Sequence, residues 1–494
     1  MKKNILYTTL FATIGLVSCS KDFLNEPKPT SSVSRETAFG SSEGAWANMA
    51  GILRSMRLQY SRTDTGNITS LYFARTVKGN DFMVRNNWFT KDYEHDNRDP
   101  NTSRSSFSWD YLYSLIGKIN DEIDGVEKAT TISTAVKNQL LGQAYTMRAY
   151  LYFELSLEFQ HTYTYNTKLF APPIYTEANK QAGNPLSTQE ELYAFILKDI
   201  EKAIEIGSQE RINKSYFNKQ VTYALAARVH QVMGGKGSTT EEKAHWTKAI
   251  DYAKKSYGEV ADVTTLLSPE VYKNGFNNMD EGKEWILAIP QSSTQSTYYW
   301  FAPSVFTEHE VAAYKNTFVN KTLVQSFSST DVRGGVGTKK QGKLFGQTNK
   351  TDFQQYYTRK FAFSFDAHTP LIRVPEMILI AAEGLYHTGS EADAHTLLYA
   401  LQKNRDASAT QSTNTGTALL DEILLERRKE LYGEIGVEWY DAKRLQKGIT
   451  RDSWHNVNLS TNPILANDKR FYLLVPQGEI DANDKISRNI NDNR

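Results

Sequence analysis

Cys19 is the only cysteine of this 494-residue chain, and its surroundings predict what its thiol does. Two lysines open the chain and an apolar run follows at 5–17. The segment Leu16-Val17-Ser18-Cys19 then has the cleavage-site residues that lipid-modifying signal peptidases require. We therefore predict that Cys19 becomes the lipidation site, and the lack of a second cysteine favours this over an ordinary signal peptide with a chance cysteine.

We predict that the N-terminal segment consists of a signal peptide followed by a tether. The apolar run is too short to span a bilayer, which takes about 20 apolar residues. We predict residues 1–18 as a lipoprotein signal peptide and 19–40 as a polar, proline-containing lipidated tether. Several acyl chains on Cys19 would anchor the protein stably.

The sequence contains no complete catalytic side-chain pattern. The single cysteine is committed to lipid, and the nine histidines do not have metalloprotease spacing. We expect no catalytic residue, no cofactor and no metal ion. The carboxylate pair of a glycoside hydrolase is defined by spatial separation, which a sequence does not reveal, so a secreted lipid-anchored glycoside hydrolase stays as an alternative.

An acidic cluster lies in the N-terminal part of the chain. Asp92, Glu94, Asp96 and Asp99 have the oxygen ligands that calcium prefers. Asn97 stands where the known twelve-residue calcium loop has glycine, and a solvated acidic loop is the favoured interpretation, with calcium binding left open.

Composition excludes one class of partner and favours another. Lys and Arg number 57 against 56 Asp and Glu, a net charge of +1 without a basic block, so nucleic acid is not expected. Aromatic residues make up 12% of the chain, which suits both a helical core and stacking against planar ligands.

Two aromatic segments combine rings with polar side chains, as sugar binding requires. They are 80–89 in the N-terminal half and 298–301 in a later loop-rich region. Sugar C–H faces lie flat on aromatic rings while their hydroxyls take fixed polar partners. Packing under loops is an equal alternative for any one ring. The candidate ligand contacts are, in order, Trp88, Trp300, Tyr299, Asp81 and Arg85, with Tyr356 and Tyr357 in reserve.

Apolar residues recur at helical spacing along most of the chain, so we predict a mainly α fold. The expected helices cover Ser42–Tyr60, Trp109–Lys128, Ser133–His161, Thr188–Ile206, Lys219–Met233, Glu241–Tyr257, Pro375–His387, Glu391–Arg405, Thr417–Tyr432 and Val437–Gln446. Small residues and glycine turns at 221–253 and 377–398 indicate tetratricopeptide-like helix pairs as a scaffold. We predict a single domain at 41–494 with a loop-rich binding insertion at about 274–369, which contains a strand at 285–290 and, with proline-rich loops, supplies the short strands.

A series of short motifs runs through the chain in a recognisable order. They are 141–153, 171–174, 188–204, 331–333, 359–361, 370–383, 426–431, 439–444 and 471–480. In this order they resemble the SusD/RagB family of outer-membrane nutrient-capture lipoproteins of the Bacteroidota. One departure is Glu438, where the family pattern has arginine. The motif charges, Arg148, Arg373, Glu376, Glu383, Glu426, Arg427 and Asp441, are predicted to be paired ions that link helices.

The resemblance implies a function and a location. It implies a lipid-anchored protein at the outer membrane, facing the cell exterior, that captures a glycan and passes it to a SusC-like TonB-dependent transporter. The tether after Cys19 also resembles the export tag of surface lipoproteins of this group. A protein of the same fold that binds peptides or another nutrient is a further alternative.

Overall fold

The structure is a computed structural model that describes residues 34–292, 303–312 and 314–494. Cys19, the signal peptide and most of the tether therefore lie outside the described residues. The end of the predicted tether forms a short helix, α1 (Arg35–Phe39), which packs on the body of the protein. Its Phe39 ring is buried where α5 (Ser103–Lys128) has a glycine, Gly125.

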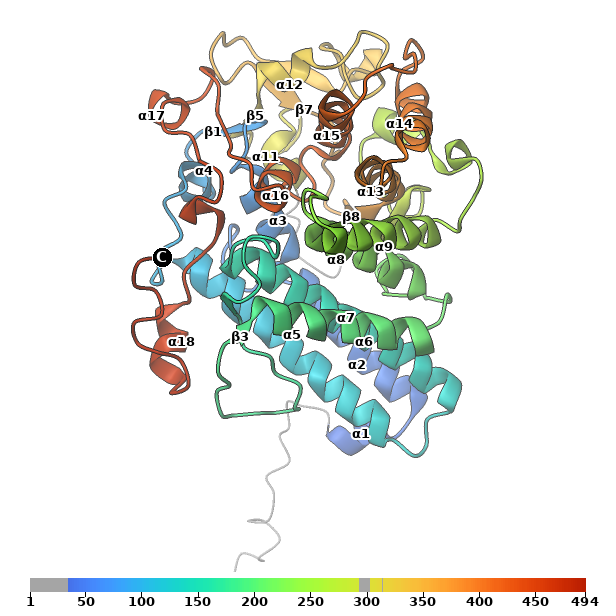
Figure 1. The fold of residues 1–494 in the computed structure, drawn as a ribbon, viewed down its shortest axis with the longest axis vertical. Helices are drawn as coiled ribbons and strands as arrows, with labels where there is room; N and C mark the ends of the chain where they lie inside the picture. Colours follow the sequence, from blue (N-terminus) through green and yellow to red (C-terminus); the bar gives the residue numbers. More distant parts are fainter. Residues whose placement is uncertain (1–33, 293–302, 313) are drawn as a thin grey trace, which may run out of the picture.

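Helices dominate the described chain, which confirms the mainly α prediction. In Figure 1 most long helices of the N-terminal half fill the lower part, those of the middle cross the centre, and the long helices of the C-terminal half lie above them, while the short helix α18 (Gln477–Ala482) lies at the lower left. The N-terminal group is α2 (Ser42–Arg57), α3 (Ile68–Thr76), α5 (Ser103–Lys128), α6 (Thr134–Phe159) and α7 (Gln189–Ile206). The middle and C-terminal groups are α8 (Lys219–Gly234), α9 (Thr240–Ser256), α13 (Val374–His387), α14 (Glu391–Arg405), α15 (Thr417–Leu431) and α16 (Val437–Arg444). Short helices are α4 (Thr90–Glu94), α10 (Glu270–Asn274), α11 (Pro303–Thr307), α12 (Lys321–Gln325), α17 (Val457–Ser460) and α18 (Gln477–Ala482).

The ten expected helices are present, with ends that differ by a few residues. The largest shift is at α5, which begins at Ser103 because the Thr102 hydroxyl accepts a hydrogen bond from the Ser105 N–H and caps the helix. Helix α3 was not predicted. All nine of its residues are buried, so it has no polar face and no amphipathic period.

The two predicted pairs are present, α8 with α9 and α13 with α14, and α6 packs in addition against both α5 and α7. Small residues let them approach closely. A Cβ on Gly142 of α6 would lie 2.6 Å from the Cα of Gly207 after α7, and a Cβ on Gly384 of α13 would lie 2.6 Å from the Ile250 side chain of α9. No helix among the described residues is both long and apolar enough to cross a membrane.

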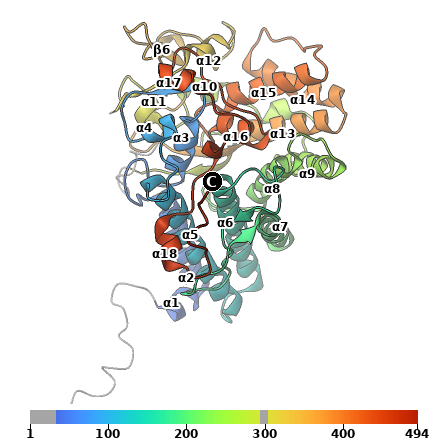
Figure 2. The same cartoon turned by 60° about the vertical axis from the view of Figure 1, so that its left-hand side comes forward.

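Short antiparallel strands form a small sheet at the upper end of the molecule (Figures 1 and 2). Its order is β1 (Phe82–Val84), β5 (Thr317–Val319), β7 (Tyr356–Thr358) and β6 (Phe345–Gln347). The predicted strand is present as β4 (Trp285–Ile289), which pairs with β8 (Thr369–Arg373), while β2 (Phe170–Ala171) pairs with β3 (Ser187–Thr188). Because β1 comes from the N-terminal half, the expectation that strands arise only from the insertion and the proline-rich loops is wrong.

Buried ion pairs join the elements, and the prediction for the motif charges is confirmed. Each motif charge has an oppositely charged partner, in the pairs Arg148–Asp199, Arg228–Glu376, Arg444–Glu383, Arg333–Glu426, Arg427–Asp441 and Arg373–Glu434.

The largest ionic cluster centres on Glu430 of α15, whose side chain is 0% exposed. Its carboxylate accepts hydrogen bonds from Arg373 at 2.9 Å, from Arg333 at 3.0 Å and from Arg405 at 3.1 Å. Burial alone would raise the pKa of Glu430, but the three guanidinium groups hold it well below its usual range. The cluster ties α15 to β8, to α14 and to the loop around Arg333.

We expect Glu430→Gln to lower the free energy of unfolding by about 3–5 kcal/mol, because it leaves three buried guanidinium groups with too little negative charge. Urea denaturation measures the effect. The control is Arg488→Gln, which breaks an ion pair with Asp481 whose side chains are 64% and 61% exposed and should change stability by less than about 1 kcal/mol. Equal stability of the two variants would contradict the assignment.

A second prediction concerns His230, which is buried between α8 and α9 and stacks on Tyr252. Burial lowers the pKa of His230 to about 3. Between about pH 6.5 and 3 the unfolded chain therefore takes up a proton that the folded protein excludes, and stability falls as pH falls by at most about 1.4 kcal/mol per pH unit from this group. In His230→Gln the decline measured by denaturation at several pH values should be shallower. His395→Gln, on α14 and not buried, should keep the wild-type slope, and a wild-type slope in His230→Gln would refute the assignment.

Candidate functional site

The predicted aromatic segment of the N-terminal half forms the end of β1 and the turn that follows it. Phe89 is fully buried against Phe73 and Phe306 and anchors the turn. The preceding ring, Trp88, is 41% exposed. One face of Trp88 is supported by Tyr314, with ring centroids 4.4 Å apart. The turn therefore holds a supported indole at the protein surface.

Hydrogen bonds fix the turn on the sheet. The Arg85 N–H donates to the Asn316 carbonyl at 2.8 Å, next to β5. The Asn87 side chain donates to the Asn316 side chain at 2.9 Å and accepts from the Phe89 N–H at 2.7 Å. Asn86 has φ +37°, a left-handed conformation that asparagine tolerates. The turn is thus set in one conformation before any ligand arrives.

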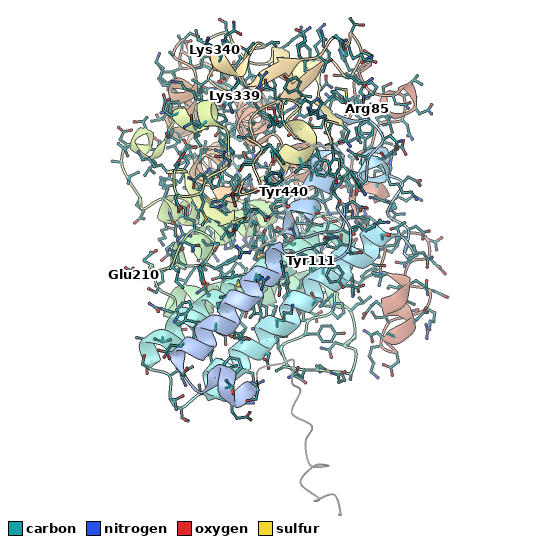
Figure 3. All side chains as sticks on the ribbon, turned by 180° about the vertical axis from the view of Figure 1, so that it is seen from behind. Arg85, Tyr111, Glu210, Lys339, Lys340 and Tyr440 are labelled. Carbon is teal, nitrogen blue, oxygen red and sulfur yellow. The ribbon has the colours of Figure 1, made fainter. Side chains whose placement is uncertain are left out.

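Arg85 lies beside Trp88 and projects from the molecule, as labelled in Figure 3. Its guanidinium lies 5.9 Å from the Phe318 ring centroid and donates to Gln354 at 3.1 Å. Among the residues that the structure describes it makes no ion pair, so its remaining donors are open to a ligand.

A hollow of about 420 Å³ opens next to this turn. It is lined by Val84, Asn86, Thr90, Tyr93, Glu94, Phe353, His455 and Asn456. The Tyr93 hydroxyl lies 2.8 Å from the His455 Nδ1. Burial, with Arg451 nearby, lowers the pKa of His455 to about 4, so this ring is neutral near pH 7. Its other nitrogen, Nε2, lies 3.0 Å from the Asn80 carbonyl, so the ring joins the hollow to the start of β1.

Asp81 has a different place from the one predicted. Its side chain is 4% exposed, and its carboxylate accepts from Arg428 of α15 at 2.7 Å. Burial raises the pKa of Asp81, with Glu438 adding to the rise and Arg428 opposing it. Its carboxylate holds β1 on the helices and does not face a ligand.

The residue that departs from the family pattern, Glu438, has a positioning role. Its Oε2 accepts hydrogen bonds from the N–H groups of Asn80 and Asp81, both at 2.7 Å, immediately before β1. Gly436, with φ +71°, permits the tight approach, since a Cβ there would lie 2.3 Å from the Arg75 Cβ. The helix after this turn therefore holds the start of the aromatic segment.

Of the four remaining candidate residues, two lie outside the described part of the chain and two lie in the small sheet. Trp300 and Tyr299 lie outside the described residues. Tyr356 and Tyr357 lie on β7 in the same sheet, but the Tyr357 ring already stacks on His309 at 4.9 Å and its hydroxyl accepts from Arg359. The structure thus places Trp88 and Arg85 together on the surface and leaves Tyr356 partly buried against the sheet.

Of the acidic cluster, Asp92 is buried, whereas Glu94, Asp96 and Asp99 are exposed to solvent. Both oxygens of Asp92 accept from Arg104, at 3.0 and 2.9 Å, and Asn97 also donates to it. Within the described ranges no group of three or more His, Cys, Asp or Glu side chains is placed to hold a metal ion. Asp92 is therefore not free to be a calcium ligand.

Sequence reasoning missed several residues of the site. Tyr314, Phe353 and His455 come from segments more than 200 residues away from Trp88, and no local pattern marks them. Glu438 could have been singled out from the sequence, because it stands where the family pattern has arginine.

Comparison with known proteins places this geometry in a family. Residues 22–230 match the family model described as "Starch-binding associating with outer membrane", and residues 291–491 match the model of the SusD family. The chain is 23% identical to "SusD-like protein P38" of Formosa agariphila, over 90% of this chain and 92% of that protein.

Solved structures share the fold. A SusD-like carbohydrate binding protein of Bacteroides vulgatus superposes with a TM-score of 0.78 at 22% identity, over 90% of this chain and 97% of that one. A SusD superfamily protein of Bacteroides thetaiotaomicron gives 0.77 at 24% identity, over 90% and 99%. At these identities the structures establish the fold, and the family models cover both halves of the sequence. This chain belongs to the SusD/RagB family.

Proposed function

We propose that the protein captures a glycan at the cell surface and delivers it to a SusC-like TonB-dependent outer-membrane transporter. Membership of a family of carbohydrate-binding, non-catalytic proteins supports a binding role over the hydrolase alternative. The observation that carries the proposal is the exposed indole of Trp88, which packs against Tyr314. Exposed Arg85, three residues earlier, forms no ion pair among the described residues, and its guanidinium donates only to Gln354.

The chemistry of this surface suits a sugar. The free face of Trp88 accepts the C–H face of a pyranose ring, and Arg85, Asn86 and Glu94 offer donors and acceptors for hydroxyl groups. The neighbouring hollow of about 420 Å³ falls within the roughly 300–1,000 Å³ of small-molecule sites. Trp300 and Tyr299 remain proposed contacts of the same ligand.

The anchoring proposal rests on the sequence alone. Cys19 would carry the lipid, residues 1–18 would be removed, and the tether would hold the body outside the outer membrane. The single domain would then begin near α1, with the insertion at about 274–369 supplying much of the ligand surface.

We expect Trp88→Ala to weaken binding about fivefold, because one stacked ring contributes on the order of 1 kcal/mol. A glycan array, extended with peptide pools, identifies the ligand of the purified protein in detergent, and calorimetry measures the affinity of each variant. The thermal melting temperature should barely move. Tyr165→Ala, which removes another exposed ring from the loop after α6, is the matched control and should bind like wild type.

Two results would contradict this site. Unchanged affinity in Trp88→Ala would place the ligand elsewhere, and a stability loss of about 3–5 kcal/mol would make Trp88 a packing residue. Selective binding of peptides, or release of new reducing ends from a bound glycan, would favour the peptide or hydrolase alternative.

A separate prediction tests the anchor. Cys19→Ala should remove fatty-acid labelling and release the protein from the outer-membrane fraction, because lipidation needs the Cys19 sulfur as nucleophile. Ser20→Ala, which changes the next residue, should be labelled and retained. Labelled, membrane-retained Cys19→Ala protein would overturn the prediction.

A further inference from the structure

A second pocket lies between the last turn of α2 and the edge of β4 that does not pair with β8. Its volume is about 260 Å³. The Tyr111 hydroxyl, on α5, donates to the Met56 carbonyl at 2.6 Å and fixes the α2 wall. Figure 3 shows Tyr111 near the centre of the view and Arg85 toward the upper right.

The residues that line this pocket are of two kinds. Leu53, Met56, Phe217, Leu287, Ile289 and Leu371 are apolar. Arg54, Arg57, Asn213, Ser215 and Tyr216 are polar or basic. None of the lining residues is an aspartate or a glutamate. The polar lining therefore presents mainly hydrogen-bond donors and positive charge.

The two arginines have no carboxylate partner among the described residues. Arg57 is partly buried, and its one side-chain hydrogen bond is a long contact of 3.4 Å to the Pro290 carbonyl. Arg54, one helical turn earlier, is exposed and forms no ion pair within the described part of the chain. Burial, with Arg54 nearby, lowers the pKa of Arg57, which shows that its charge sits in an unfavourable environment. An anion in the pocket would offset both the burial of the Arg57 charge and its repulsion by Arg54.

Neighbouring charges do not neutralise the pair. Arg211 and Lys214, on the segment that covers the β4 edge, donate to backbone carbonyls and add positive charge. The acidic groups in this region, Asp280 and Asp366, act on His368, and neither contributes to the shift of Arg57.

We propose that this pocket binds the acidic group of a charged sugar residue, either the carboxylate of a uronic acid or a sulfate ester. Paired guanidinium groups are the donors that best match such oxyanions. The apolar lining receives the C–H face of the ring, and a volume below about 300 Å³ suits one sugar ring. This inference rests on the proposed function, because it takes the ligand to be a glycan.

The first experiment does not depend on the Trp88 site. Thermal melts of the purified protein in detergent are recorded with galacturonate, with inorganic sulfate and with neutral galactose. Galacturonate or sulfate should raise the melting temperature of wild type, while galactose should not. The double variant Arg54→Gln/Arg57→Gln should lose this response. Arg62→Gln/Arg488→Gln removes the same charge elsewhere and should keep it.

Stabilisation by galacturonate would assign a carboxylate ligand, and stabilisation by sulfate alone would assign a sulfate ester. An equal response in the two double variants, or no response in wild type, would overturn the proposal.

The second experiment uses oligogalacturonate and its carboxyl-reduced counterpart, with a sulfated galactan and its desulfated form as the second pair. In calorimetry, wild type should bind the acidic form of one pair at least tenfold more tightly than the neutral form. In Arg54→Gln/Arg57→Gln the ratio of the two dissociation constants should approach one. Trp88→Ala should weaken the binding of both forms and keep the ratio of their dissociation constants.

If wild type binds the neutral form as tightly as the acidic form, or if Arg54→Gln/Arg57→Gln keeps the preference for the acidic form, the pocket is not an anion site although the proposed function stands. If Trp88→Ala changes neither form while the ratio depends on the arginines, the Trp88 site fails and the pocket stands.

Discussion

The buried carboxylate of Glu430 is the interaction on which much of the structure depends. A charge removed from water is tolerable only where opposite charges and hydrogen bonds replace the solvent. Arg333, Arg373 and Arg405 supply that replacement from three different parts of the chain. Each arginine also meets a second carboxylate, Glu426 for Arg333, Glu434 for Arg373 and Glu284 for Arg405, so the cluster joins the C-terminal helices, β8 and the loop-rich insertion at many points.

The same principle extends to the ligand surface. Arg428 on α15 pairs with Asp81, and Glu438 on α16 caps the backbone just before β1. The start of β1 is therefore fixed to the helical scaffold by charge, and its end is fixed to β5 by the strand ladder and by Asn87. Trp88 follows these two attachments directly and precedes the fully buried Phe89, so it stands on a rigid support and little conformational entropy is lost when a ligand binds.

The sequence was informative where structure is local. The helices were predictable because their apolar period is set by neighbours three and four residues away, whereas β1 was not, since its three residues pair with Thr317–Val319 far along the chain. Trp88 and Arg85 were chosen from residue type, and the structure places both at the surface. The burial of Asp81 was not foreseen, because residue type does not reveal burial. Arg57 was not singled out, because a basic residue in the last turn of a helix ordinarily complements the helix dipole.

The surroundings of the basic side chains differ with their burial. The fully buried arginines of the C-terminal half, such as Arg333 and Arg405, meet carboxylates. Two other buried basic groups, Lys443 and Arg451, form no ion pair within the described residues and instead donate to backbone carbonyls. Arg54 and Arg85 are exposed, and Arg57 makes one long contact of 3.4 Å to a carbonyl. These three side chains therefore keep donors that the described part of the protein does not use, which is what the proposed binding of a glycan requires.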